Sequence, residues 1–268
     1  MSDANAGSRA SARPAPPLRS VAALAALELR LTARRGENVL VTLVIPAAVL
    51  LFFGGVAVPP GLPVRPMDHL LPGTVALAIV AAGLVNLGIA TAYERSYGVL
   101  KRLGGAPLPR WGVLAAKAGA LLVLELVQVL VLVAVAVVGF GWAPGPGWSP
   151  ILAAVAIVLG TLVFAALGLL LAGTLRAEAT LALANGLFLA FLMLGGLVVP
   201  VEQLPPFLKP VAAALPATAL ADLLRIALDS GVPVAPAGPG TVAGPLAILA
   251  SWATGATLLA VRFFRWDA

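Results

Sequence analysis

The sequence has 268 residues, of which 61% are hydrophobic and only 10% are charged. Soluble domains carry about 25% charged residues, so this chain has too little polar surface to coat a water-soluble globule, and we expect lipid to surround most of it. The net charge of +6 would raise nucleic acid as a partner of a soluble protein. Here the basic residues cluster between apolar runs, which indicates membrane topology instead. The absence of cysteine excludes disulfides and thiolate metal sites.

The N-terminal segment, residues 1–17, is rich in Ser, Ala, Pro and Arg and is predicted to be a disordered tail. Residues 18–35 are predicted to form an amphipathic helix on the membrane surface. Its leucines share one side and its arginines group on the neighbouring side: Leu24, Leu27 and Leu31 against Arg19, Arg30 and Arg34. An ordinary solvated helix is the alternative for this segment.

Six apolar segments follow, each long enough to cross a bilayer core, which takes about 20 helical residues. All six are too long for buried strands, so we predict an all-α membrane protein with six transmembrane helices in one domain, residues 18–268. The predicted spans are residues 39–58, 71–92, 113–140, 151–175, 179–199 and 241–261.

The distribution of Lys and Arg predicts the orientation of these spans. An even number of spans places both termini on one side of the membrane, together with most of the basic residues of the chain. The other side holds only Arg65, Lys209 and Arg225. By the positive-inside rule, both termini are therefore predicted to be cytoplasmic.

The connector between the second and third spans, residues 93–110, carries more structure than topology requires. Glu94 and Arg95 open it, and Val99, Leu100 and Leu103 give it an apolar side before a run of Gly and Pro breaks any helix. This pattern predicts a short amphipathic helix that lies across the cytoplasmic membrane surface and presents a face to a partner. A merely solvated loop is the alternative.

A second segment, residues 200–240, lies on the predicted external side. Residues 207–215 and 217–229 are helical pieces too short to cross, and four prolines break the chain around them. We predict a short re-entrant helical hairpin that dips into the outer leaflet and returns, provided that protein covers its backbone ends. An amphipathic hairpin lying flat outside is the alternative.

Catalytic motifs are missing from the sequence. There is no GxxxxGK[ST] run to cradle nucleotide phosphates and no GxSxG serine. His69 is the only histidine, which excludes HExxH and multi-histidine metal sites, and beside Asp68 it is expected to be an exposed loop residue. We therefore predict no catalytic residue and no metal site in the chain.

Four strongly polar residues lie inside the predicted spans: Asn86, Glu125, Gln128 and Asn185. Glu125 lies near mid-membrane, where an ionised carboxylate costs at least about 2.5 kcal/mol, so it should face protein or a wet cavity. Gln128 is one turn away on the same side. These residues are candidates either for a transport pathway or for hydrogen bonds between helices.

The connector resembles the loop after the second span of ABC-2 type transporter permeases. The resemblance rests on Glu94-Arg95-Ser96-Tyr97-Gly98-Val99-Leu100-Lys101-Arg102-Leu103 and the following GGAPLPR. Ser96 and Val99 depart from the family, which often has Glu and Thr there. The segment GGLVVPVEQLPPFLKPVAAALPATALADLLRIAL is similar to the family's region between spans five and six. The likeness covers nearly the whole chain after Leu18.

The resemblance implies a half-transporter of a bacterial cell membrane. Two permease subunits, expected as a homodimer, would form the pathway, and two copies of a cytoplasmic ABC ATPase would bind below and carry ATP and Mg. The permease itself would hold no cofactor. The ATPase-coupling residues would be Glu94, Arg95, Gly98, Leu100, Lys101, Arg102 and Leu103. The family mostly exports drugs or antibiotics, glycolipids and polysaccharides, and the apolar interior favours an amphipathic or lipid-like cargo over an ion.

Two rival functions follow from the residues alone. In a proton- or ion-coupled secondary transporter, Glu125 would be the coupling carboxylate, although such proteins often show repeated halves and further intramembrane ionisable groups. A lipid-modifying membrane enzyme would need a cluster of acids or histidines at the interface, and the loops offer none.

Overall fold

The computed structural model describes residues 17–34, 36–56, 58, 62, 65–99, 110–232 and 241–265, and regular structure within these residues is entirely helical. The all-α prediction is thereby confirmed, whereas the predicted disordered tail falls almost wholly outside the described residues. The elements are α1 (Pro17–Arg34), α2 (Gly36–Gly55), α3 (Met67–Val80), η1 (Ala81–Leu87), α4 (Gly88–Ser96), α6 (Arg110–Phe140), α7 (Pro150–Thr174), α8 (Ala177–Leu194), η2 (Val201–Gln203), α9 (Lys209–Ala214), α10 (Pro216–Ala227) and α11 (Ala243–Phe263).

Five helices of the described chain are long and apolar enough to cross a membrane: Met67–Ser96, Trp111–Phe140, Pro150–Thr174, Ala177–Leu194 and Ala243–Phe263. They coincide with five of the six predicted spans. The remaining predicted span, residues 39–58, overlaps α2, whose described apolar part, Leu43–Gly55, is shorter than a crossing helix. The structure therefore describes a multi-pass helical membrane protein, and the sixth span stays a prediction.

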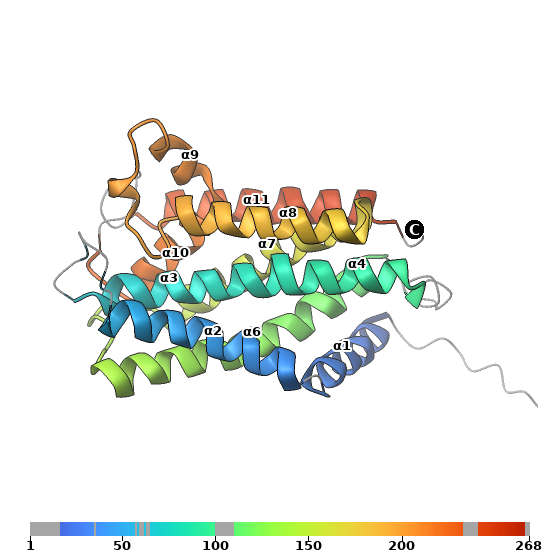
Figure 1. Cartoon of the computed structure of the whole chain (residues 1–268), viewed down its shortest axis with the longest axis horizontal. Coiled ribbons are helices and arrows are strands. Elements are labelled where there is room, and N and C mark those ends of the chain that lie inside the picture. The colour runs from blue at the N-terminus through green and yellow to red at the C-terminus, as the bar shows by residue number, and fades with distance from the viewer. Residues whose placement is uncertain are drawn as a thin grey trace, which may run out of the picture.

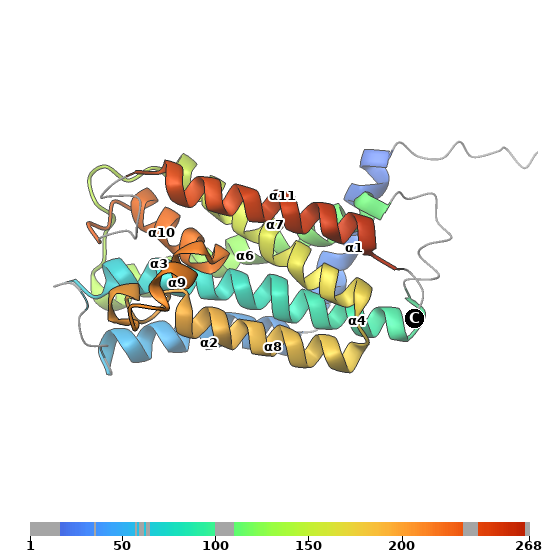
Figure 2. The ribbon, with the colours of Figure 1, turned by 90° about the horizontal axis from the view of Figure 1, so that it is seen from above.

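Helix α7 is the centre of the bundle. It packs against α11, α10, α6 and the continuous rod formed by α3, η1 and α4. Phe164 of α7 is fully buried and meets Phe191 of α8 edge to face, with ring centroids 5.7 Å apart. Figure 2 shows α11 on one side of the α3–η1–α4 rod and α8 and α2 on the other.

The two ends of the bundle carry different elements (Figure 1). The end of α4, helix α1 and the end of α11 lie together at one end, whereas α9 and α10 lie at the other. Because α1 and the end of α11 share an end of the bundle, the described chain returns to the end from which it starts.

Three glycines let α7 approach the α3–η1–α4 rod closely where that rod is π-helical. A Cβ added at Gly168 would lie 2.3 Å from the Gly83 carbonyl oxygen, and one added at Gly88 would lie 3.0 Å from the Gly168 Cα. Real side chains do not fit into such gaps, so this contact needs glycine.

Helix α8 ends at Leu194, earlier than the predicted span end at residue 199. Gly195 caps the helix, and Gly196 has a φ of +64°, in the left-handed region that favours glycine. The chain therefore turns after α8 and forms α9 and α10. Helix α9 lies within the predicted short helix of residues 207–215, and α10 begins one residue before the predicted residues 217–229. Helix α10 is buried along nearly its whole length against α3, α7 and α11.

Candidate functional site

The predicted ATPase-coupling segment is described only at its beginning. Glu94 and Arg95 lie in the last turn of α4, and Gly98 follows with a φ of +72°, so the helix ends in a left-handed turn. Leu100, Lys101, Arg102 and Leu103 lie outside the described residues. Within the connector, residues 93–110, the structure describes residues 93–99 and 110.

Lys117 of α6 reaches two carboxylates from two other helices. Its Nζ lies 2.8 Å from Glu28 Oε1 of α1 and 2.8 Å from Glu94 Oε2 of α4. The Lys117 side chain is only 2% exposed, whereas those of Glu28 and Glu94 are 17% and 26% exposed. A cation so deeply buried needs opposite charge beside it, and these two acids supply it. The three residues, Glu28, Glu94 and Lys117, are called the Lys117 clasp below.

Arg95, the residue after Glu94, contacts a different part of the chain. It is buried, and its Nη2 donates to the carbonyl oxygen of Leu175 at 2.5 Å, in the turn between α7 and α8. The first two charged residues of the connector thus contact different neighbours, Glu94 the helix α6 and Arg95 the α7–α8 turn.

These contacts change what the connector offers to a partner. Because Glu94 and Arg95 contact other helices and turns of the chain, the described outward surface of the connector consists of Ser96, Tyr97 and Val99, and the last two are 75% and 42% exposed. Tyr93 and Tyr97 stack on each other, with centroids 6.2 Å apart. A protein that docks on residues 93–99, which are called the mouth of the connector from here on, would meet an aromatic and aliphatic surface.

Glu125 lies in the contact between α6 and α7. The side chain is 1% exposed, and its Oε2 lies within hydrogen-bond distance of the Thr161 hydroxyl. That hydroxyl has one O–H, which it shares between Glu125 and the Ile157 carbonyl oxygen 2.8 Å away. Glu125 Oε1 has no hydrogen-bond partner among the described residues. Gln128, one turn further along, is likewise buried, at 2% exposure. The carboxyl of Glu125 therefore links two helices and keeps one oxygen unpartnered.

The two candidate asparagines lie on elements that pack together. Asn86 belongs to the π-helical segment η1, and Asn185 belongs to α8, which contacts η1 and α4. Both residues are exposed, and Asn185 Nδ2 donates to the Leu181 carbonyl of its own helix at 2.8 Å. Exposed amides are unusual on an apolar span, because polar groups are costly toward lipid.

Comparison with protein families gives one assignment. The model of the ABC-2 type transporter family matches residues 19–228, which is more than half of the chain and includes nearly all of α1, the described part of the connector and α10. The chain belongs to the ABC-2 type transporter family. Comparison with curated proteins finds no match.

The members of the ABC-2 family are membrane permeases, which carry out transport and are not themselves catalytic. A permease of this family works with an ABC ATPase, which implies such a partner here. Helix α11 lies beyond the matched residues but packs on α7 along with the rest of the bundle.

The sequence reading of His69 as an exposed loop residue is wrong. His69 lies in the first turn of α3 and is 2% exposed, and its Nε2 lies 3.3 Å from Nη2 of Arg225 in α10. Asp68 beside it accepts from the indole nitrogen of Trp142 at 2.9 Å. The helix starts directly after Pro66, and α10 folds back over that start. A proline followed by an acid within two residues is a helix-start signature that could have revealed this.

Arg225 is the centre of this second buried polar cluster of the permease, which sequence reasoning missed. It donates to Asp222 Oδ1 at 2.8 Å and to the Gly196 carbonyl at 2.6 Å, and it is 3% exposed. Burial raises the pKa of the Asp222 carboxyl to about 6, although the neighbouring Arg225 acts in the opposite direction. The cluster ties α10 to the start of α3 and to the turn after α8.

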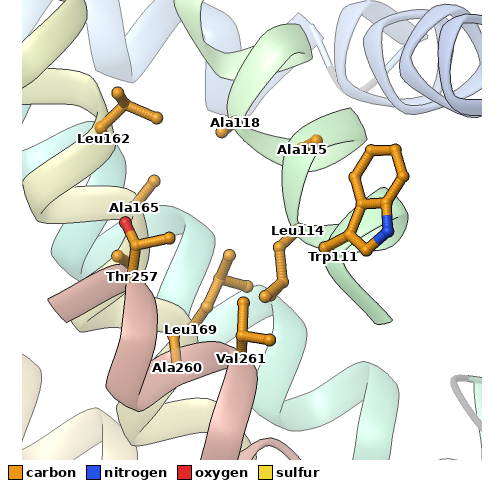
Figure 3. A pocket seen from close by; sticks show the side chains of 11 residues that line it. Trp111, Leu114, Ala115, Ala118, Leu162, Ala165, Leu169, Thr257, Ala260 and Val261 are labelled. Carbon is orange, nitrogen blue, oxygen red and sulfur yellow. The ribbon is translucent and has the colours of Figure 1, made fainter. Parts of the chain in front are cut away.

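A cavity of about 240 Å³ lies among α6, α7 and α11 of the permease (Figure 3). Its lining is aliphatic and aromatic apart from the Thr257 hydroxyl and the indole nitrogen of Trp111. It therefore offers no charged group to a ligand, and its chemistry suits hydrocarbon. The candidate polar residues Asn86, Glu125, Gln128 and Asn185 do not line it.

Proposed function

We propose that this chain is the six-span permease subunit of an ABC exporter in a bacterial cell membrane, with both termini in the cytoplasm. The observation that carries the proposal is the family match over residues 19–228, which takes in the mouth of the connector and the helical segment after α8. Helix α2, which is 20 residues long, serves as the first span.

The arrangement of charge supports this orientation. Exposed arginines gather on α1 and at the end of α11, which lie at the same end of the bundle as the connector (Figure 1): Arg19, Arg30, Arg34, Arg262 and Arg265. The described basic residues of the opposite end are Arg65, Lys209 and the ion-paired Arg225. The basic end is the cytoplasmic end by the positive-inside rule.

The energy for transport comes from a separate ABC ATPase. The sequence holds no phosphate-binding GxxxxGK[ST] run, so ATP and Mg are bound by the partner and the permease carries no cofactor. Two ATPase copies dock on the connectors of two permeases, and each connector, residues 93–110, transmits their movement into the spans. The exposed Tyr97 and Val99 form part of that docking surface.

The transport pathway runs between two copies of the chain, on the side of α8 and η1. Asn86 and Asn185 are exposed there on an otherwise apolar surface that includes Leu189 and Met193, 56% and 62% exposed. A second copy covers this surface and removes the cost of facing these amides to lipid. Amides set in hydrocarbon suit an amphipathic or lipid-like cargo, such as a drug, an antibiotic, a glycolipid or a lipid-linked polysaccharide.

Single-cysteine cross-linking tests this assembly, because the chain has no native cysteine. Leu189→Cys on α8 should give a cross-linked dimer with a short bismaleimide, while the permease co-purifies with an ABC ATPase. Leu258→Cys on α11, which is 65% exposed on the other side of the rod, is the matched control and should stay monomeric. Cross-linking through Leu258→Cys alone, or a permease that binds no ATPase, would contradict the proposed assembly.

A further inference from the structure

The Lys117 clasp joins three elements that are far apart in the sequence. One buried ammonium group of α6 is shared by a carboxylate of α1 and a carboxylate at the mouth of the connector, each at 2.8 Å. Lys117 therefore links α1 to the start of the connector. An ABC ATPase that pushes on the connector therefore pushes on Lys117 through Glu94.

Helix α1 is fastened to α6 beside the clasp. Leu24 of α1 is buried with Val113 and Ala116 of α6, and Val21 and Ala25 pack against the same small cluster. This apolar contact fixes α1 along α6, while the ion pairs fix both helices to α4. The connector mouth, α1 and the start of α6 are thus bonded into one body at the basic end of the bundle.

We propose that Lys117 is a positioning residue that makes α1, the start of α6 and the mouth of the connector move as one unit during transport. The proposal rests on the proposed function, since it needs an ATPase that displaces the connector. Helix α1 is then part of the coupling machinery rather than a passive surface anchor, and the clasp stays closed throughout the cycle.

Removal of the cation does more than delete one bond. In Lys117→Met, Glu28 and Glu94 would be left side by side without an opposite charge, and two neighbouring carboxylates repel each other. The variant should therefore separate α1 from the connector while the apolar contact with Val113 and Ala116 remains. Lys117→Arg keeps the charge and both partners and should restore the unit.

Spin-label distances test the physical link without any ATPase. Leu27→Cys on α1 and Tyr97→Cys on the connector, 50% and 75% exposed, can be labelled in the full-length chain in liposomes, diluted with unlabelled chain. We expect one narrow distance distribution with Lys117 or Lys117→Arg and a broad one with Lys117→Met. Arg30→Gln, an exposed charge change on α1, is the control and should leave the distribution narrow. An equally narrow distribution in Lys117→Met would overturn the proposal.

If Lys117→Met does not fold, Glu28→Gln and Glu94→Gln take its place. Each removes one of the two ion pairs and leaves Lys117 one acid, so each should broaden the same distribution to a smaller degree. Two unchanged distributions would show that the clasp does not hold α1 to the connector.

The complex with its ATPase supplies the second measurement, the number of cargo molecules moved per ATP hydrolysed. Lys117→Met should keep ATP hydrolysis but lower this ratio about tenfold, and Lys117→Arg should restore it. A normal ratio in Lys117→Met would overturn the proposal. A wild-type complex without ATP-driven transport would instead refute the proposed function, and the spin-label result would still decide the link.

Discussion

Lys117 and Glu125 lie on the same helix, α6, yet their surroundings give them different roles. Lys117 has two carboxylates from other helices beside it, whereas Glu125 has one hydroxyl, that of Thr161, and one oxygen without a partner. The arrangement around Lys117 needs the ammonium group and its neighbouring carboxylates to stay charged, because a buried ammonium group without acids is unstable. The second needs only a hydrogen-bond acceptor in the contact with α7.

Glu125→Gln therefore distinguishes a structural acid from a coupling acid. The amide oxygen of Gln can still accept from Thr161, so we expect ATP-driven transport by the complex to stay within about threefold of wild type, a cost below 1 kcal/mol. In a proton-coupled transporter the same change would abolish uptake or efflux driven by a pH gradient. Loss of ATP-driven transport in Glu125→Gln, with normal ATPase binding, would assign Glu125 to the pathway.

In the buried ion pair of Arg225 and Asp222, removal of one partner should destabilise the protein more than removal of both. Arg225→Met leaves Asp222 buried without its cation, and we expect a loss of about 3–5 kcal/mol in the free energy of unfolding, seen as a lower Tm in detergent. The double variant Asp222→Leu, Arg225→Met removes both charges and should recover most of that loss. A double variant as unstable as the single one would show that the bonds to Gly196 and His69, rather than the ion pair, hold α10.

The contact between α7 and the α3–η1–α4 rod depends on glycine. In Gly168→Ala the new Cβ would lie 2.3 Å from a backbone oxygen, that of Gly83, so the two helices must move apart. We expect a loss of about 1–3 kcal/mol in the free energy of unfolding. Gly186→Ala on α8 is the matched control: nothing lies within 4 Å of its Cβ, and better helix propensity should leave Tm unchanged or raise it. Equal effects of the two changes would contradict the close contact.

The helices were predictable from sequence because the spacing of apolar runs depends only on bilayer thickness and helix rise. Residues 113–140 and 151–175, for example, became α6 and α7 within a few residues. The end of α8 could not be predicted in this way, because Gly195 and Gly196 lie inside an apolar run that hydropathy alone extends to residue 199.

The contacts between elements were beyond a single sequence. Glu94 was placed correctly at the mouth of the connector, but its partner Lys117 and the third member, Glu28, come from helices whose relative rotation no local pattern specifies. His69 was misplaced for the same reason, since only the return of α10 over α3 buries it. Asn86 and Asn185 can be singled out as polar residues in spans, but their exposure on two elements that pack together cannot be predicted.

At the scale of the whole molecule, the orientation of the bundle can be read with a membrane-impermeant maleimide on intact cells. Phe207→Cys, 74% exposed near α9, should react directly. Tyr97→Cys, at the opposite end, should react only after the membrane is opened (Figure 1). These results follow from the basic end of the bundle staying in the cytoplasm. Labelling of Tyr97→Cys on intact cells would reverse the orientation and remove the connector from any cytoplasmic ATPase.

The most direct test of the whole account is transport by the purified permease in proteoliposomes, with and without its ABC ATPase, using a fluorescent amphipathic lipid as cargo. The permease with ATPase and MgATP should move the lipid across the bilayer, and omission of the ATPase or of ATP should stop it. Movement by the permease alone under a proton gradient, with no effect of ATPase and MgATP, would contradict the claim that this chain draws its energy from a partner bound at the connector.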